Sequence, residues 1–285
     1  KSTFTMVPTV GIGYRFPLHH FITDNLSEID VLEVNLDQYF AAGRYRQSRL
    51  EPFVGTIPLI GHSVGLSLGT DVLPDIRYLE KISLGIEQLE IPFFSEHLGF
   101  TKSSGLHLGS LLPVPRTEEA AEVMIRNVMF VKARLPVPLY LENISYYFEY
   151  PESDFSEEEF INLVCREAGV SVMLDLQNLY VNSVNHSLDS HSYIDSLPTG
   201  LVKAMHTAGG RYIEDVLIDD HGHAIADPVL DLVEYALERQ NPTTIILERD
   251  NRIEETDEIL NDIRRLKARV EHSTTNKDVS NALAS

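Results

Sequence analysis

The sequence contains little cysteine and little basic charge, and it has no long hydrophobic run. Its one cysteine, Cys165, excludes an internal disulfide and is typical of a reducing compartment, so we expect a cytoplasmic protein. The 23 Lys and Arg residues against 43 Asp and Glu give a formal net charge of −20. This balance argues against nucleic-acid binding, which needs clustered basic side chains, and it favours metal cations as ligands.

The hydrophobic segments are too short for membrane spans, which require about 18 or more consecutive apolar residues. The first ten residues, KSTFTMVPTV, lack the long apolar core and cleavage site of a signal peptide, so we do not expect one here. With 43% hydrophobic residues the chain can still bury a sizeable core. These features predict a globular protein without a membrane partner.

Short apolar, β-branched segments recur along the chain and predict eight strands, at 11–15, 31–35, 58–64, 92–98, 138–144, 170–176, 201–207 and 244–250. Their near-continuous apolar character is typical of parallel strands buried on both faces. Helical spacing or helix-start residues occur between them, at 73–89, 117–135, 156–168, 227–239 and 255–270. Eight strand–helix units predict an α/β fold, a (β/α)8 TIM barrel. We expect one domain over 1–270 and a polar, flexible tail over 271–285.

Polar side chains stand at the ends of seven successive predicted strands. They are Glu33, Asn35, His62, Glu96, His97, Glu142, Asn143, Asp175, Asn178, His206, Glu248 and Asp250. In a parallel barrel these ends converge on one rim, the C-terminal face. Histidine and carboxylate without cysteine is a ligand set for zinc, iron or manganese. Because crowded carboxylates repel one another strongly without a cation, the pattern predicts a metal centre.

The stretch LIDDHGHAIADP at 217–228 has two interpretations. Asp and Gly are common in turns, so it could be only a polar turn before a helix that starts near Asp227 and Pro228. The strand-end pattern favours a ligand loop instead. In that interpretation Asp219 and His221 lie on one side of the chain and chelate together. Asp220 and His223 then lie beside the ligands or face the substrate.

Alternation along a strand also separates the side chains of the SEH motif. Ser95 and His97 point to one side of the strand, and Glu96 points to the other. We therefore expect His97 to be a metal ligand, and Glu96 to support the site from outside or to form a structural ion pair.

Many strings resemble one known family: GIGYR, LEVN, HSVGLSLGT, SEHLGF, LLPVPRTEEA, LENISYYF, MLDLQNLYVN, HTAGG, LIDDHGHAIADP and ILERD. They resemble the multinuclear non-haem iron-dependent oxidative enzymes, which include the methanobactin-biosynthesis oxidase. The resemblance covers roughly residues 10–260 and implies a xylose-isomerase-like TIM barrel with two or three irons of mixed Fe(II)/Fe(III) valence. It further implies O2-dependent modification of a ribosomally made precursor peptide, commonly at cysteine. A small partner protein is expected to deliver that peptide.

The resemblance also implies the ligands of each iron. The first set is His62, His97 and Glu142; the second is Glu142, Asp175, His206 and Glu248; the third is Asn178, Asp219 and His221. Glu142 is implied to bridge two irons, and the catalytic residues are expected to be Glu142, Asp175 and His206. Residues expected to bind substrate or support the ligands are Glu33, Glu96, Asn143, Asp220, His223, Arg211 and Arg249. Arg249 and Arg211 depart from the family pattern, which has an aromatic residue and a histidine near those positions.

Two other classes of function fit part of the pattern. A divalent-metal hydrolase or isomerase of the endonuclease IV or xylose isomerase type places similar ligands on the same barrel rim. An endonuclease would need basic loops, which a chain of this charge offers poorly, and an isomerase would consume no O2. A non-enzymatic peptide-binding or metal-storage protein would not explain so many converging ligands.

Overall fold

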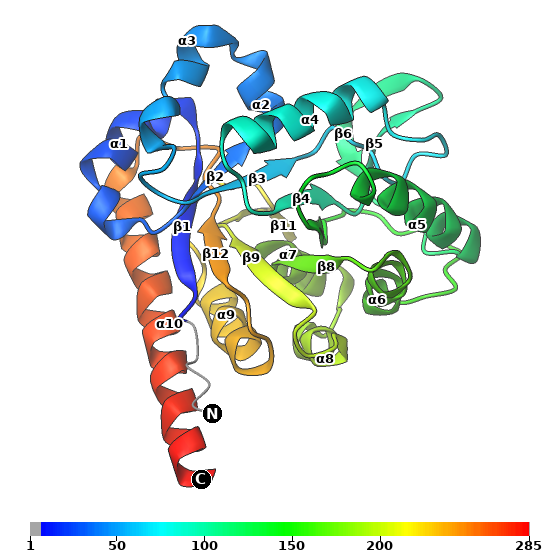
Figure 1. Cartoon of the computed structure of the whole chain (residues 1–285). Helices are drawn as coiled ribbons and strands as arrows, with labels where there is room; N and C mark the ends of the chain where they lie inside the picture. The colour runs from blue at the N-terminus through cyan, green and yellow to red at the C-terminus, as the bar shows by residue number, and fades with distance from the viewer. Residues whose placement is uncertain (1–6, 285) are drawn as a thin grey trace.

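A closed barrel of eight parallel strands forms the centre of the computed structural model, which describes residues 7–284 for the backbone and 7–275 for the side chains (Figure 1). The strand order is β1-β12-β9-β8-β7-β4-β3-β2, and β2 pairs again with β1. The strands are β1 (Thr9–Tyr14), β2 (Leu32–Asn35), β3 (Leu59–Ser63), β4 (Phe94–His97), β7 (Leu139–Glu142), β8 (Ser171–Asp175), β9 (Val202–Thr207) and β12 (Thr244–Leu247). The predicted TIM barrel and all eight predicted strands are thereby confirmed.

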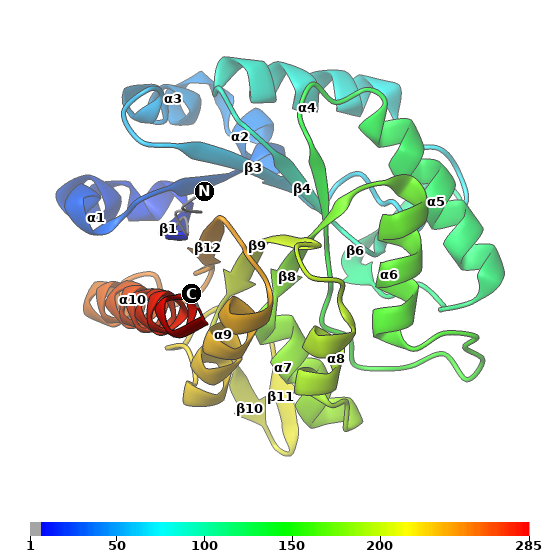
Figure 2. The same ribbon diagram turned by 60° about the horizontal axis from the view of Figure 1, so that its bottom comes forward.

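Helices surround the barrel on its outer side (Figure 2). They are α1 (His19–Asp24), α2 (Leu36–Ala41), α3 (Gly43–Ser48), α4 (Ile76–Gln88), α5 (Glu118–Lys132), α6 (Glu157–Ala168), α7 (Leu176–His186), α8 (Ser190–Ser196), α9 (Asp227–Arg239) and α10 (Thr256–Ala284), with short 3-10 turns at Phe16–Leu18, Leu26–Glu28 and Glu51–Phe53. The Thr117 hydroxyl accepts a hydrogen bond from the first turn of α5, and Ser156 forms a capping box with Glu159 at the start of α6. None of the helices described is long and apolar enough to cross a membrane.

Two antiparallel hairpins extend from loops at the C-terminal ends of the strands, and the sequence analysis did not predict either one. The first joins β5 (Phe100–Ser103) to β6 (Leu106–Leu112) after β4, and the second joins β10 (Arg211–Ile213) to β11 (Val216–Ile218) after β9. Their strands are short and largely exposed, so they lack the continuous apolar runs that identify barrel strands.

The C-terminal helix α10 runs without interruption through Thr256–Ala284 and thus includes most of the predicted flexible tail. Ile259, Ile263, Leu266 and Val270 pack into the main core, and Ser273 is still buried. The helix therefore continues past residue 270 even though the sequence becomes polar. The domain boundary at that residue stays a prediction.

The barrel interior is built of two layers. Residues of the lower layer are apolar: Val31, Ile60, Phe93, Met173, Ala204 and Ile246, with Tyr140 packed against them. Side chains of a strand alternate between its two faces, so the residues two positions farther along point into the same interior, one layer nearer the C-terminal rim. These residues form what we call the polar layer: Glu33, His62, Ser95, Glu142, Asp175, His206 and Glu248.

An asparagine of α7 fixes the loop that follows the polar-layer residue of β7. The Asn182 side chain is fully buried; its amide donates to the Ile144 carbonyl at 2.9 Å, and its carbonyl accepts from the Tyr146 N–H at 3.1 Å. Both backbone groups are buried, so without Asn182 they would lack partners.

We expect Asn182→Leu to lower the free energy of unfolding by about 1–3 kcal/mol for each buried backbone group left unpaired. Asn162→Leu is the matched control, because the Asn162 amide donates to a Ser196 carbonyl in a bond reached by solvent. Urea unfolding followed by circular dichroism measures both. Equal losses in the two variants would contradict the role assigned to Asn182.

Candidate metal centre

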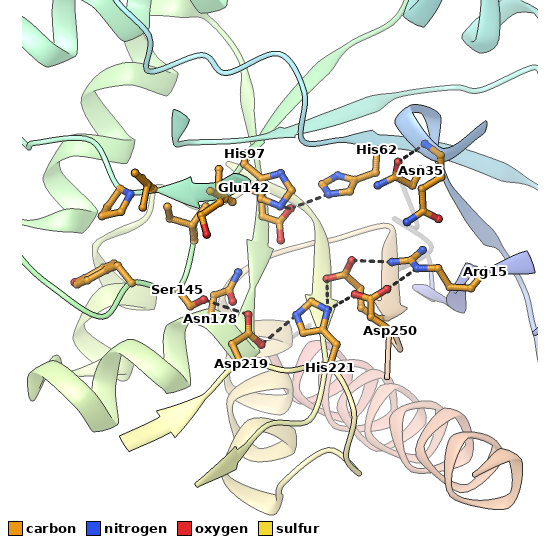
Figure 3. A pocket seen from close by; sticks show the side chains of 18 of the residues that line it. Arg15, Asn35, His62, His97, Glu142, Ser145, Asn178, Asp219, His221 and Asp250 are labelled. Atoms are coloured by element: carbon orange, nitrogen blue, oxygen red, sulfur yellow. Dashed lines mark hydrogen bonds and ion pairs between the residues drawn. The ribbon is translucent and has the colours of Figure 1, made fainter. Parts of the chain in front are cut away.

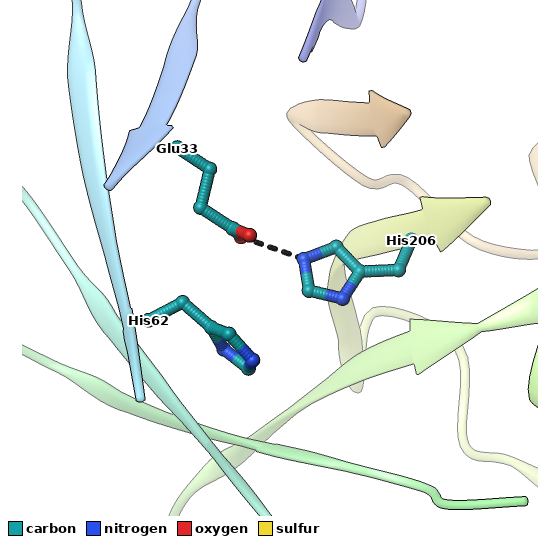
Figure 4. Close-up of side chains that lie close together, drawn as sticks. All are labelled: Glu33, His62 and His206. Atoms are coloured by element: carbon teal, nitrogen blue, oxygen red, sulfur yellow. Dashed lines mark hydrogen bonds and ion pairs between the residues drawn. The ribbon is translucent and has the colours of Figure 1, made fainter. Parts of the chain in front are cut away.

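The polar layer is almost completely buried and very rich in charge. Glu33, Glu142, Asp175 and His206 are each at most 1% exposed, yet three of these four side chains are acids. Figure 4 shows Glu33 and His206 facing each other across the barrel, with the His62 ring below them. Buried carboxylates at this density require compensating positive charge.

The first group of converging side chains is His62, His97 and Glu142, as the sequence predicted for one metal. Oε2 of Glu142 lies 3.4 Å from Nε2 of His62 and 3.3 Å from Nε2 of His97. One ligand atom of each residue lies within 4.8 Å of the others, which suits a shared cation. Figure 3 shows both histidine rings turned toward this carboxylate.

The second group is Glu142, Asp175, His206 and Glu248, which also matches a predicted set. Nδ1 of His206 lies 3.0 Å from Oε1 of Glu142 and 3.5 Å from Oε2 of Glu248. The two oxygens of Glu142 thus face different groups, Oε2 the first and Oε1 the second. This is the arrangement that a carboxylate bridging two cations requires.

The third predicted set is brought together at one side of the same pocket (Figure 3). Nε2 of His221 lies 3.0 Å from Oδ1 of Asp219. The Asn178 side chain is buried, and its amide nitrogen donates to the Asn143 carbonyl, which leaves its carbonyl oxygen available as a ligand. Ser145 donates to the other oxygen of Asp219 at 3.2 Å.

Hydrogen bonds fix the tautomers of His62 and His97. Nδ1 of His62 lies 2.8 Å from the Ser95 hydroxyl, which itself donates to the Gly61 carbonyl, so Nδ1 must carry the proton. Nδ1 of His97 lies 3.0 Å from the Ser63 carbonyl, which can only accept. In both rings the unprotonated Nε2 is therefore directed at Glu142, as a metal-binding histidine requires.

The other two histidines are oriented by carboxylates. Nε2 of His206 lies 2.6 Å from Oε2 of Glu33, and Nδ1 of His221 lies 2.9 Å from Oδ2 of Asp250. When these nitrogens donate, Nδ1 of His206 and Nε2 of His221 are free to bind a cation. Carboxylate partners of this kind also make the imidazole a better ligand.

Four buried ligand atoms have no hydrogen-bond partner among the described residues: Glu142 Oε2, Asp175 Oδ2, Asn178 Oδ1 and Asp219 Oδ1. All four are acceptors in the predicted ligand sets. With the tautomers fixed as above, two of these oxygens, Glu142 Oε2 and Asp219 Oδ1, face histidine lone pairs at 3.0–3.4 Å. Two acceptors at that distance repel each other unless a cation or a proton lies between them. The residues therefore fit bound metal ions.

The pKa values of these groups reflect the same imbalance of charge. Burial, together with the neighbouring Glu142, Asp219 and Glu248, raises the pKa of Asp175 well above its ordinary value. Burial alone would lower the pKa of His97, but the Glu142 and Glu96 carboxylates outweigh it and raise the value to about 9. Without metal, protons thus take the place of cations; a bound cation favours the ionised carboxylate and the neutral imidazole.

Glu96 and Asn143 support the ligands from behind, in line with their predicted positions. Glu96 faces away from the barrel interior and accepts hydrogen bonds from the His97 and Leu66 backbone at 2.7 and 3.0 Å. Asn143 pairs with both the N–H and the carbonyl of Asp175, at 2.8 and 2.9 Å. Both residues hold backbone that carries a ligand.

All seven residues suggested as substrate-binding or supporting residues lie outside the pocket lining; the four not yet described are Asp220, His223, Arg211 and Arg249. Asp220 pairs with His223 at 3.1 Å and with Arg211 of the β10–β11 hairpin at 3.0 Å. Arg249 is fully buried and pairs with Glu258 of α10. Alternation along the strand explains the position of Arg249. It directly follows Glu248, which points into the barrel, and so its own side chain points toward the helix layer.

The sequence analysis did not assign a role to Arg15, and it recorded Asp250 only as a strand-end residue. Nε of Arg15 donates to Oδ1 of Asp250 at 2.5 Å, and its Nη2 lies 3.7 Å from Glu248. The glycine at residue 13 leaves room for the Arg15 guanidinium. A Cβ on Gly13 would lie only 2.9 Å from Nη1 of Arg15. The GIGYR string could have identified Arg15 as a site residue, because the first barrel strand, like the others, is followed by an ionisable side chain.

The metal groups form the floor of a pocket of about 690 Å³ that opens at the C-terminal rim (Figure 3). Its walls include β6 through Leu111 and Leu112, and the loop after β7 through Tyr146, Tyr147 and Phe148. On the opposite side lie Arg15, Phe16, Asn35, Gln38 and Arg46. The pocket is large enough for several residues of an extended peptide.

Solved structures with the same barrel include D-psicose 3-epimerase from Clostridium cellulolyticum and endonuclease IV from Thermus thermophilus. The epimerase has a TM-score of 0.57 and 13% identity, covering 93% of this chain and 98% of its own. The endonuclease has a TM-score of 0.57 and 14% identity, covering 93% of this chain and all of its own. At this identity the likeness establishes the xylose-isomerase-like fold alone.

Sequence relatives cover nearly the whole chain. A UPF0276 protein of Acinetobacter baylyi is 31% identical over 276 residues, 96% of each chain. A UPF0276 protein of Shewanella sediminis is 34% identical over 256 residues, 89% of this chain and 91% of its own. The family model described as RiPP precursor modification enzyme MbnB/TglH/ChrH, where RiPP denotes a ribosomally synthesised and modified peptide, matches residues 9–271. The chain belongs to this family of enzymes that modify ribosomally made precursor peptides.

Proposed function

We propose that this protein is a multinuclear non-haem iron oxidase that uses O2 to modify a ribosomally made precursor peptide at a cysteine. The observation that carries the proposal is the bridging position of Glu142, whose two oxygens face two different groups of histidine and carboxylate ligands. Family membership supports the class of substrate. Ligands of nitrogen and oxygen without sulfur suit iron, and they also suit zinc.

Three ion positions follow from the ligand sets. His62, His97 and Glu142 would hold one ion, and Glu142, Asp175, His206 and Glu248 a second. Asn178, Asp219 and His221 would hold the third. Bound iron would supply the redox chemistry that O2 activation and thiol oxidation need.

The protein's own contribution is orientation and charge. In each of the four histidines, one ring nitrogen is hydrogen-bonded to the protein, and the other is thereby directed at the proposed ions. The partners of the bonded nitrogens are Ser95, the Ser63 carbonyl, Glu33 and Asp250. A thiol that reaches this floor would lose its proton readily, because cations stabilise the thiolate. The apolar layer below excludes water from the barrel interior, which limits side reactions of the substrate.

The walls of the pocket support a peptide rather than a duplex as substrate. The pocket opens between the β6 wall and the aromatic loop after β7, and Arg15 and Arg46 are the two basic side chains of its lining. With a net charge of −20, the chain offers little attraction for a nucleic-acid backbone. We include two further points in this proposal: the protein is cytoplasmic, and a small partner protein delivers the peptide.

Protein reconstituted with ferrous iron under anaerobic conditions is expected to bind two or more iron atoms per chain and to take up O2 when peptide is added. Metal analysis by mass spectrometry and an oxygen electrode measure the two properties. Zinc competes for such ligands and binds more tightly than ferrous iron, so zinc-loaded protein is the control. Turnover by the zinc form without O2 would favour the hydrolase or isomerase alternative.

A peptide encoded beside the gene and co-expressed with it is expected to change in mass, and a Cys→Ser version of that peptide is expected to stay unmodified. The reason is that a thiolate, unlike a hydroxyl group, is readily bound and oxidised at iron. Intact-mass spectrometry before and after aerobic incubation measures this. Cleavage of abasic DNA, or modification of the Ser version, would contradict the substrate proposed here.

Glu142→Gln is expected to empty both ion positions that share this side chain and to abolish turnover, because the amide keeps the size but removes the charge between two cations. Asp219→Asn is expected to lose about one ion per chain. Glu122→Gln is the matched control: Glu122 is exposed in α5, outside the pocket lining, and should keep the full complement.

Metals per chain and product after a single turnover should be measured for these three variants side by side. Retention of all iron in Glu142→Gln would rule out the bridging role. Equal loss in Glu142→Gln and Glu122→Gln would instead point to general destabilisation.

A further inference from the structure

A second cavity of about 190 Å³ adjoins the metal pocket on the side of α2 and α3. The two cavities share Phe16, Asn35, Gln38 and Arg46 in their lining, so they lie side by side. Figure 3 shows Asn35 at the Arg15 end of the metal pocket, across from Ser145. The second cavity therefore lies beside one end of the space that a substrate would occupy.

The inner walls of this cavity are apolar and aromatic, formed by Tyr14, Phe16, Val34, Tyr39, Ala42 and Leu50. Val34 and Leu50 are 2% and 3% exposed, so they make a closed floor. Burial raises the pKa of Tyr14 to about 12, which is consistent with its poorly hydrated surroundings.

Three polar side-chain groups of the lining have partners within the protein. The Tyr14 hydroxyl pairs with His19 at 3.1 Å, and the Asn35 carbonyl accepts from the Gln38 N–H at 3.0 Å. The Gln47 amide donates to the Tyr39 carbonyl at 2.9 Å. Val34, Ala42 and Leu50 offer a polar ligand no side-chain hydrogen bond, and leaving its own groups unpaired against them would cost binding energy.

The volume of this cavity and the cation at its mouth both favour an aromatic ring as the occupant. A cavity of about 150 Å³ lined by aliphatic and aromatic side chains takes up benzene, so this one has room for a single aromatic ring. The Arg46 guanidinium lies 4.8 Å from the centre of the Phe16 ring, at the boundary of the two cavities. A cation in that position also attracts the face of an incoming ring.

We propose that this cavity, which we call the aromatic subsite, binds an aromatic side chain of the peptide substrate near the residue held at the metals. The inference rests on the proposed function, because the occupant reaches the subsite as part of the same peptide. Its consequence is sequence specificity at a fixed distance from the modified residue. Burial of one aromatic ring should tighten binding about tenfold or more.

The test uses synthetic peptides with one cysteine in a Gly/Ser background and one Phe placed one to four positions before or after it. Their dissociation constants for the iron-reconstituted protein are measured anaerobically by calorimetry. One placement of Phe is expected to bind about tenfold or more tightly than the Phe-free peptide. No preferred placement of Phe, or a larger gain in affinity from a matched series that carries Glu in place of Phe, would overturn the subsite.

Ala42→Leu narrows the subsite and should abolish the Phe preference while the Phe-free peptide binds as before. Ala41 also lines the subsite, so Ala41→Leu should narrow it and give the same result. Agreement between the two variants makes a folding defect in one of them an insufficient explanation. Ala133→Leu is the matched control, an exposed position at the end of α5 away from the rim, and should keep the preference. A preference that persists in both narrowed variants would also overturn the subsite.

The same measurements separate this inference from the function on which it rests. If cysteine peptides bind and drive O2 uptake without regard to Phe, the aromatic subsite is wrong and the oxidase proposal stands. If no cysteine peptide binds or drives O2 uptake, while metal analysis finds iron in place, the oxidase proposal itself fails.

Discussion

The structure depends on one electrostatic constraint: four carboxylates lie together in an almost completely buried layer of the barrel. They are Glu33, Glu142, Asp175 and Glu248. Charges of one sign at this density cannot stay ionised without positive charge between them. Histidines supply further candidate ligands, and their outer nitrogens are fixed so that lone pairs point inward. Replacing buried charged groups with apolar ones is often neutral or stabilising, so this layer is not explained by stability. Its composition fits bound cations, and the apolar layer and the helices around it supply the packed core.

Strand alternation explains how a small number of sequence changes can create such a site. Seven of the eight barrel strands, all except β1, provide a residue of the lower layer and a polar one two positions later, such as Ile60 and His62, or Met173 and Asp175. The lower layer keeps the barrel packed whatever the upper layer contains. The same barrel is found in an epimerase and in endonuclease IV at only 13–14% identity, so the fold tolerates wide changes in sequence.

The barrel could be predicted because its eight strands are continuous apolar runs. The candidate residues at the strand ends could be found because they follow those runs directly, whereas the three ligand sets came from the family resemblance and stay predictions. The sequence analysis missed the β5–β6 and β10–β11 hairpins, whose exposed strands carry no such run. It placed Arg249 near the substrate because the residue adjoins a ligand, whereas alternation turns it toward Glu258. The continuation of α10 past residue 270 depends on packing of Val270 and Ser273 against the body, which a polar composition conceals.

Under the proposed function, metal ligands and substrate contacts come mainly from different parts of each strand–helix unit. The first two ligand sets stand at strand ends, where neighbouring strands restrict their position, whereas Asn178 lies in α7 and Asp219 and His221 lie in the loop after β11. The pocket walls are loops, hairpins and the short helices α2 and α3. Changes in the loop after β7 would leave the first two sets in place, since His62, Glu142 and His206 are held by residues of the barrel itself. The barrel would then set the reaction and the rim the choice of peptide, through residues such as Phe16 and Tyr147.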